Sequence, residues 1–171
     1  MPRKNKKLPR HLLVIRTSAM GDVAMLPHAL RALKEAYPEV KVTVATKSLF
    51  HPFFEGLDVG FLDIETRRTH RGIRGAIRFA REAAELKIDA VADMHNVLRS
   101  KMVRAALHLR GIPVSVIHKG RIEKYMRLGR GSEGVKPLKH TVIRYCDVFR
   151  RLGFDFPDPR PAEKRPRPNP M

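Results

Sequence analysis

The fold of this chain is clearest in residues 12–23, which read Leu12-Leu13-Val14-Ile15-Arg16-Thr17-Ser18-Ala19-Met20-Gly21-Asp22-Val23. Its first four residues are all apolar, which is typical of a strand covered on both faces in a parallel sheet. After a short polar turn, residues 22–37 carry Val23, Leu26, Leu30 and Leu33 at helical spacing. A strand that runs into a helix places the turn between them at the carboxyl edge of a sheet, where open α/β folds bind ligands.

The same alternation of strands and helices continues along the chain. With the first strand at 12–16, further strands are expected at 41–46, 58–63, 89–93 and 114–117. Helices are expected at 70–86, 97–109 and 140–152, with short helical pieces at 48–56 and 121–128. Such alternation implies a parallel sheet. We therefore predict an α/β fold consisting of a single Rossmann-like domain.

The length of 171 residues accommodates one domain with a substantial core. We predict a basic disordered tail at 1–10, the Rossmann-like domain at 11–154 and a proline-rich basic tail at 155–171. No apolar run is long enough to span a bilayer, and the amino terminus lacks an apolar signal segment, so we expect a cytoplasmic protein. We interpret several residues as core packing: Cys146, Phe50, Phe53, Phe54, Met20, Met25 and Met94.

A formal net charge of +18 predicts that the chain meets polyanions. Nucleic acid, an anionic membrane surface and a phosphorylated substrate all fit, and charge alone does not choose among them. Part of the charge gathers at the two ends of the chain, where an alternative is that it forms solvated tails with no dedicated partner.

Three common ligand motifs are missing from the sequence. The first turn has one glycine, Gly21, where a dinucleotide fingerprint needs three, and no P-loop sequence occurs. The histidines show no metal-ligand spacing. We therefore predict no metal and no cofactor.

Asp22 is the candidate catalytic residue. An aspartate in the first turn of a helix is favoured by the helix dipole alone, so a capping role is the alternative. As a general base it would take a proton from an incoming hydroxyl. The helix amino terminus keeps the carboxylate ionised but weakens it as a base, which suits transfer of a sugar from a good leaving group such as a nucleotide diphosphate.

Other candidate ligand-binding residues follow the strands on the same edge of the sheet. Thr17, Ser18 and the backbone amides of Met20 and Gly21 would hold a hydroxyl or a phosphate. His95 and Arg99 flank the end of the fourth predicted strand, and Lys119 follows the fifth. For His95, a hydrogen-bonded packing role is the alternative.

The residues of the first turn resemble the opening of glycosyltransferase family 9, the ADP-heptose:lipopolysaccharide heptosyltransferases. The opening stretch is followed by Leu26-Pro27 and Leu30-Arg31-Ala32-Leu33, as in that family. Residues 88–93 with 96–100, and 119–121 with 140–145, resemble later segments. The resemblance covers residues 11–154, and the Ser-x-x-Gly-Asp turn is its most specific element.

This resemblance implies the amino-terminal half of a GT-B fold, in which two Rossmann-like domains face each other across a cleft. The family inverts the sugar carbon without a metal, and its amino-terminal domain holds the acceptor and the catalytic base. Carried onto this sequence, the base is Asp22, and Met20 and Gly21 lie near the transferred sugar. Arg67, Arg68 and Arg71 would contact acidic groups of a lipopolysaccharide acceptor, although a solvated loop face is the alternative.

In the family a carboxyl-terminal domain holds the nucleotide-sugar donor, of the ADP-heptose type, and this sequence ends where that domain would begin. We therefore expect the chain to be inactive by itself. The leading hypothesis is an acceptor-binding domain that acts on an anionic glycolipid, peripheral at the inner face of the inner membrane. A basic Rossmann-like module for nucleic acid is the alternative, disfavoured by an aromatic content of 6%. A remnant that folds without activity is a third hypothesis.

Overall fold

A computed structural model describes residues 7–65, 70, 72–118 and 139–159. Within them the chain forms a five-stranded sheet in the order β3-β2-β1-β4-β5. The strands are β1 (His11–Ile15), β2 (Lys41–Thr46), β3 (Gly60–Asp63), β4 (Ala90–Asp93) and β5 (Val114–Val116). Every neighbouring pair is parallel. The predicted α/β Rossmann-like architecture is therefore confirmed.

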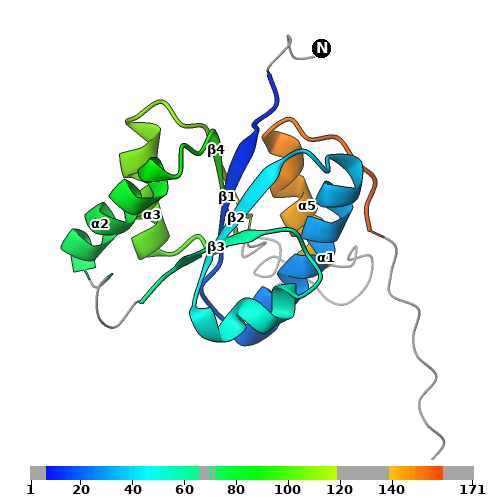
Figure 1. Cartoon of the computed structure of the whole chain (residues 1–171), viewed down its shortest axis with the longest axis horizontal. Coiled ribbons are helices and arrows are strands. Elements are labelled where there is room, and N and C mark those ends of the chain that lie inside the picture. The colour runs from blue at the N-terminus through cyan, green and yellow to red at the C-terminus, as the bar shows by residue number, and fades with distance from the viewer. Residues whose placement is uncertain (1–6, 66–69, 71, 119–138, 160–171) are drawn as a thin grey trace, which may run out of the picture.

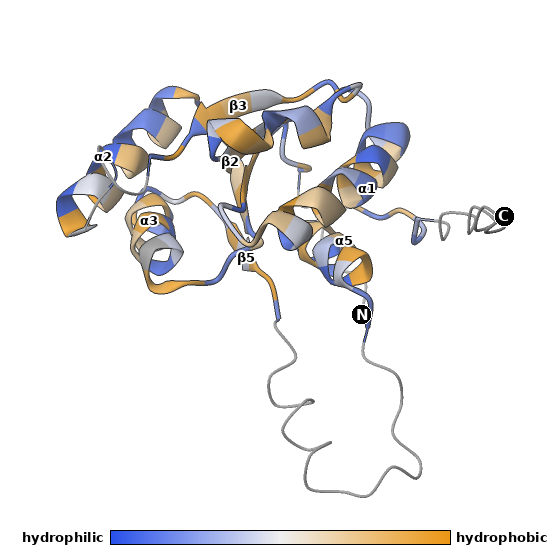
Figure 2. Cartoon of the chain, turned by 90° about the horizontal axis from the view of Figure 1, so that it is seen from below, coloured by the Kyte–Doolittle hydropathy of each residue, from blue (hydrophilic) through white to orange (hydrophobic). Residues whose placement is uncertain are grey.

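Helices cover both faces of this sheet (Figure 1). The 3₁₀-helix η1 (Ser48–Phe54) and the α-helices α1 (Met20–Ala36) and α5 (Thr141–Arg151) pack on one face. The helices α2 (Gly72–Glu85) and α3 (Leu98–His108) form the layer on the other face, as Figure 2 shows from a second side.

The central strand β1 supplies side chains to both hydrophobic layers. Leu12 and Val14 belong to the core under α1 and α5, whereas Leu13 and Ile15 belong to the core under α2 and α3. Successive side chains of a strand point to opposite faces, so an unbroken apolar run is what a strand covered twice requires. All four residues are at most 3% exposed.

The bounds of the described elements all lie within two residues of the expected ones, and one difference moves a candidate residue. The first helix begins at Met20 rather than Asp22, because the carbonyl of Ala19 already accepts a hydrogen bond from the Val23 amide at 3.0 Å. Asp22 is therefore the third helical residue. The short helical piece expected at 121–128 lies outside the described residues, as do most residues of the two expected tails.

Most of the expected packing residues are buried. Cys146, Phe50, Phe54 and Met94 are at most 5% exposed, which confirms those predictions. The packing interpretation of Met20 is wrong, because its side chain points out of the first turn of α1 and is 61% exposed. Phe53 is also partly exposed, at 36%. Phe156, two residues past the expected end of the domain, is buried in the core that Phe149 belongs to.

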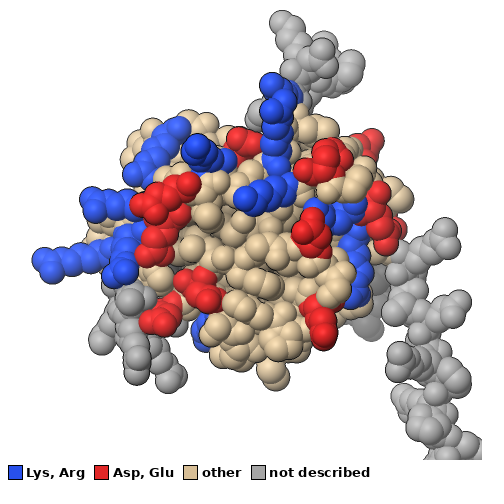
Figure 3. All heavy atoms as spheres, in the orientation of Figure 1, with Lys and Arg blue, Asp and Glu red and all other residues tan. Residues whose placement is uncertain are grey.

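The excess of positive charge is unevenly distributed along the sequence. Of the 35 Lys and Arg residues, 16 fall at 1–6, 66–69, 71, 119–138 and 160–171, together with only 3 of the 17 acidic residues. The described part of the chain is therefore much closer to charge balance than the whole. Figure 3 shows both signs on one face of it. No helix within this described part combines the length and the apolar character needed to cross a membrane.

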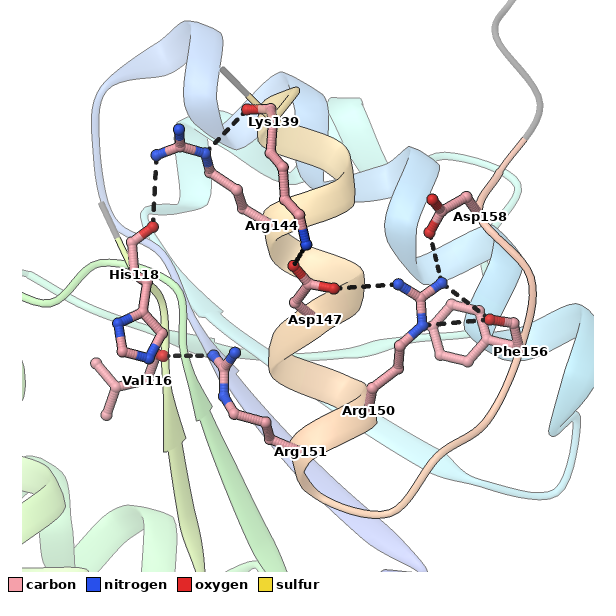
Figure 4. A network of polar contacts seen from close by, with 9 residues as sticks. All are labelled: Val116, His118, Lys139, Arg144, Asp147, Arg150, Arg151, Phe156 and Asp158. Carbon is pink, nitrogen blue, oxygen red and sulfur yellow. Dashed lines mark hydrogen bonds and ion pairs between the residues drawn. The ribbon is translucent and has the colours of Figure 1, made fainter. Parts of the chain in front are cut away.

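Two arginines at the carboxyl end of α5 fasten this helix to its surroundings (Figure 4). Arg151 donates from Nη2 to the carbonyl of Val116 in β5 at 2.6 Å. Arg150 donates to the carbonyl of Phe156 at 2.9 Å and to the carboxylate of Asp158 at 2.5 Å. These contacts hold the segment after α5 against the helix and tie α5 to the edge strand.

A close backbone contact fixes the start of α2. A Cβ atom added at Gly75 would lie 2.2 Å from the carbonyl carbon of His70, a distance that no real Cβ contact allows. The helix therefore packs directly on the backbone of the preceding turn. Only glycine permits this approach.

We expect Gly75→Ala to lower the free energy of unfolding by about 1–3 kcal/mol, because the backbone must move to admit the methyl group. Urea denaturation followed by circular dichroism measures the change. The control is Gly21→Ala in the first turn of α1, where no atom of the described residues lies within 4 Å of the added Cβ and no loss of stability is expected. Equal stability of Gly75→Ala and the wild type would contradict the contact.

Candidate functional site

A cavity of about 340 Å³ opens at the carboxyl edge of the sheet, on the side of α2 and α3. Its polar lining comes from the residues after β1, β2 and β4, from the turn before α2 and from α3: Thr17, Ser18, Lys47, His95, His70 and Ser100. Its apolar wall includes Ile15, Ile64, Phe79 and Val103. A largely apolar cavity with a few convergent polar groups is the usual form of a small-molecule site.

His95 joins two of these polar groups to β4. Its Nδ1 lies 3.2 Å from the Thr17 amide and 2.8 Å from Thr17 Oγ1, while its Nε2 lies 3.2 Å from Ser18 Oγ. A backbone amide can only donate, so Nδ1 is an acceptor and the proton of the neutral ring lies on Nε2, directed at Ser18. The peptide bond between Ser18 and Ala19 is cis.

Asp93 holds the turn that carries His95. Its carboxylate is fully buried and accepts hydrogen bonds from the amides of His95 at 2.9 Å and Asn96 at 2.8 Å. Arg104 of α3 pairs with its second oxygen at 3.2 Å. Sequence analysis did not single out Asp93, although an aspartate at the end of an apolar run, three residues before an asparagine, is a turn signal. In the structure Asn96 has the left-handed conformation that such a turn requires.

Asp22 is close in sequence to the cavity residues Thr17 and Ser18, but it does not line the cavity. Its carboxylate is ion-paired with the guanidinium of Arg16, the residue that follows β1. The Arg16 side chain is 8% exposed and also donates to the carbonyl of Met94, whereas the Asp22 side chain is 43% exposed. The carboxylate is thus held on one side and open to solvent on the other.

Tyr145 of α5 holds the first turn of α1, which carries Asp22, from the α5 side. Its hydroxyl donates to the main-chain carbonyl of Asp22 at 3.0 Å, and its side chain is fully buried. Burial raises the pKa of Tyr145 to about 12; the charge of Arg16 opposes this shift and that of Asp22 adds to it. The first turn of α1 is therefore anchored to β1 and to α5 at once.

The structure brings together some of the residues predicted to bind ligand. Thr17, Ser18 and His95 form one hydrogen-bonded cluster, with Met20 and Gly21 exposed in the adjoining helical turn. The other residues predicted to bind ligand are four arginines and one lysine. Arg67, Arg68, Arg71 and Lys119 lie outside the described residues, and so does the side chain of Arg99, whose backbone is in the first turn of α3.

His70 is a cavity residue that sequence analysis missed as a ligand candidate. Its Nδ1 accepts from the Glu65 amide at 3.1 Å, and its Nε2 donates to the Glu82 carboxylate at 3.0 Å. The ring is 5% exposed and packs edge-on against Phe79. These partners assign it to the wall of the cavity rather than to chemistry.

The chain matches no protein-family model and no curated protein sequence. Solved structures resemble it closely enough to define its class, an α/β Rossmann-like domain of the kind found in glycosyltransferases. A glycosyltransferase family 9 protein from Veillonella parvula gives a TM-score of 0.61 at 17% identity, over 84% of this chain and 42% of that one.

Two further similar structures are heptosyltransferases. Escherichia coli heptosyltransferase WaaC, solved with ADP, gives a TM-score of 0.58 at 23% identity over 86% of this chain. E. coli ADP-heptose lipopolysaccharide heptosyltransferase II gives 0.53 at 21% identity over 92%. The chain spans about half the length of these proteins, 49% and 44% respectively. At such identities the likeness establishes the fold.

Tyr145→Phe tests the anchoring of the Asp22 turn. Loss of the hydroxyl should cost about 1 kcal/mol at pH 7, because the ring still fills its site. Because the pKa of Tyr145 is raised from 10 to about 12 in the folded protein, its hydroxyl ionises at a lower pH in the unfolded state. Ionisation above pH 10 therefore favours unfolding. The wild type should therefore lose about 2–3 kcal/mol of stability from this group between pH 10 and pH 12. Urea denaturation across this pH range measures both effects, and an equally steep fall in Tyr145→Phe would contradict the assignment.

Proposed function

We propose that this chain is the acceptor-binding domain, carrying the catalytic base, of a heptosyltransferase-like glycosyltransferase. The reaction would move a sugar from a nucleotide-diphosphate donor of the ADP-heptose type to a lipopolysaccharide-type glycolipid. The observation that carries the proposal is a half-exposed carboxylate in the first turn after the central strand, in a fold shared with heptosyltransferases.

Asp22 is the proposed base. As the acceptor hydroxyl attacks the anomeric carbon of the donor sugar, its proton passes to the Asp22 carboxylate. The bond from that carbon to the nucleotide diphosphate breaks, the diphosphate leaves with the electron pair, and the configuration at the carbon inverts. Arg16 holds one carboxylate oxygen, which orients the group. A weak base is sufficient because the leaving group is good.

The cavity next to this turn is the proposed acceptor site. His95, whose two ring nitrogens bond Thr17 and Ser18, orients both hydroxyls. The oxygens of these hydroxyls can still accept from sugar hydroxyls, and Ser18 can also donate. Lys47 adds a positive charge to the lining, which suits an acidic sugar or a phosphate. Met20, Gly21 and the basic residues that lie outside the described part, together with Arg99, remain proposed substrate contacts.

A second Rossmann-like domain would hold the donor in this proposal. One of the neighbours was solved with ADP and with ADP-2-deoxy-2-fluoro heptose, which indicates the class of donor. Because the chain spans about half the length of such enzymes, we expect it to bind acceptor without transferring sugar by itself. The acceptor would be reached at the inner face of the inner membrane. Nothing in the fold comparison favours a module for nucleic acid.

Binding by the chain alone tests the acceptor assignment. A deacylated, phosphorylated inner-core oligosaccharide should shift the backbone amide resonances of Thr17, Ser18 and His95 in a two-dimensional NMR titration. ADP at the same concentration should leave them unchanged. Shifts produced by ADP and not by the oligosaccharide would reverse the assignment of the two halves.

Replacement of the base tests the chemistry. In an enzyme completed by a donor-binding domain, Asp22→Asn should lower kcat at least about 10²-fold, with little change in KM or in the melting curve. The Asn side chain keeps an oxygen that can accept from Arg16. The matched control is Asp63→Asn, at the end of β3, which also follows the carboxyl edge and is 52% exposed. Unchanged kcat in Asp22→Asn would remove Asp22 from the catalytic role.

A further inference from the structure

The outer surface of α2 carries two exposed isoleucines one helical turn apart. Ile73 is 66% exposed and Ile77 is 46% exposed. Arg74 and Arg81 are exposed on the neighbouring outward positions of the same helix. We call these four residues the α2 face. The opposite side of the helix is buried and made of small and aromatic residues: Gly75, Ala76, Phe79, Ala80 and Ala83.

The same helix forms a wall of the cavity. Gly75, Ala76 and Phe79 line it from the inner side of α2. Because α2 follows the parallel strand β3, its amino-terminal end lies at the carboxyl edge of the sheet, which places Ile73 and Ile77 toward the end where the cavity opens. Leu98, the first residue of the adjacent α3, lines the cavity and is 75% exposed. Exposed apolar side chains therefore occur on both helices at this end.

The charges on the α2 face are directed outward. The carboxylate of Glu82 is paired on both oxygens: Oε1 lies 3.0 Å from Nε of Arg78 in the same helix, and Oε2 lies 3.0 Å from Nε2 of His70. Arg74 and Arg81 then outnumber the exposed Glu85 on the remaining outward positions. Figure 3 shows Lys and Arg side chains projecting from the molecule over α2, next to acidic ones.

A single exposed apolar residue needs no explanation, but this arrangement has a recognised physical role. A helix with an apolar strip beside arginines lies well at the interface of an anionic bilayer, where the apolar side chains enter the headgroup boundary and the arginines meet phosphates. Nucleic acid would be contacted by the arginines and would leave the isoleucines without a partner. The isoleucines therefore decide between the two polyanions.

We infer that the α2 face rests on an anionic lipid surface and so sets the cavity at the membrane. The isoleucines insert, and Arg74 and Arg81 contact lipid phosphates. The inference rests on the proposed function for its purpose, since an acceptor sugar carried by a membrane glycolipid would then enter the cavity along the other side of the same helix.

The chain contains no tryptophan, so a single one reports on its surroundings. We expect the fluorescence of Ile77→Trp to shift to the blue on addition of phosphatidylglycerol vesicles at 150 mM salt, and to be quenched by brominated lipid. The matched control is Leu49→Trp on η1, in the opposite layer, where the native residue is 65% exposed. The tryptophan of this control should neither shift nor be quenched. Unshifted emission from vesicle-bound Ile77→Trp protein would overturn the inference.

Partitioning of the protein with the same vesicles measures the contributions of the two residue types. Ile73→Ser with Ile77→Ser keeps every charge and should weaken binding at least about 10-fold, because the insertion of two apolar side chains is lost. Leu49→Ser should have no effect. Arg74→Gln with Arg81→Gln should weaken binding about five-fold for each arginine. An unchanged affinity of the isoleucine variant would overturn the inference.

The remaining outcomes separate this inference from its competitors and from the proposed function. Equal binding to phosphatidylcholine vesicles would overturn the role of the arginines. DNA binding that falls in the arginine variant, with vesicle binding unchanged in both variants, would assign the surface to nucleic acid. None of these measurements requires sugar transfer. If the α2 face does not bind vesicles but the chain binds the oligosaccharide, the proposed function stands and the inference is overturned. If the α2 face binds vesicles but the chain does not bind the oligosaccharide, only the proposed function is overturned.

Discussion

The complete burial of β1 is the constraint on which the rest of this structure depends. The strand lies between β2 and β4, and both of its faces are covered by helices, so Leu12, Leu13 and Val14 are fully inaccessible to water. A strand of this kind cannot end with a charged residue unless that charge is paired, because an unpaired buried charge costs several kcal/mol. Arg16 is the residue at that point, and its pairing joins the first turn of α1 to the segment after β4.

The partners of Arg16 link three parts of the chain. Its guanidinium bonds the carbonyl of Met94 after β4 and the carboxylate of Asp22 in α1. Among the described residues its buried Nε has no hydrogen-bond partner, which is a cost that the other two bonds must offset. Tyr145 adds a fourth element by bonding the main chain of Asp22. A carboxylate that could have been an ordinary helix-capping residue is instead held in one orientation.

The turn after β1 divides the carboxyl edge into two regions. Asp22 and its partners belong to the side of α1 and α5, whereas Thr17 and Ser18 turn toward His95 and the cavity under α2 and α3. In the proposed function the acceptor occupies the cavity and presents a hydroxyl across this turn to the carboxylate. The α2 helix separates the same cavity from the surface that we assign to lipid. In these proposals, binding, chemistry and membrane contact meet around a few residues of β1, α1 and α2.

The sequence by itself determined the strand and helix order, the burial of β1 and the edge of the sheet at which the cavity opens. These features follow from apolar patterns within single strands and helices. Contacts between distant segments were decided only by the tertiary structure. Arg16 meets Met94 across 78 residues, and Tyr145 meets Asp22 across 123. No local pattern marks such pairs, so the role of Asp93, the wall position of His70 and the exposure of Met20 were not foreseen. The side of the sheet on which the cavity lies also depends on how α2 and α3 pack, and periodicity along one helix does not record the position of another.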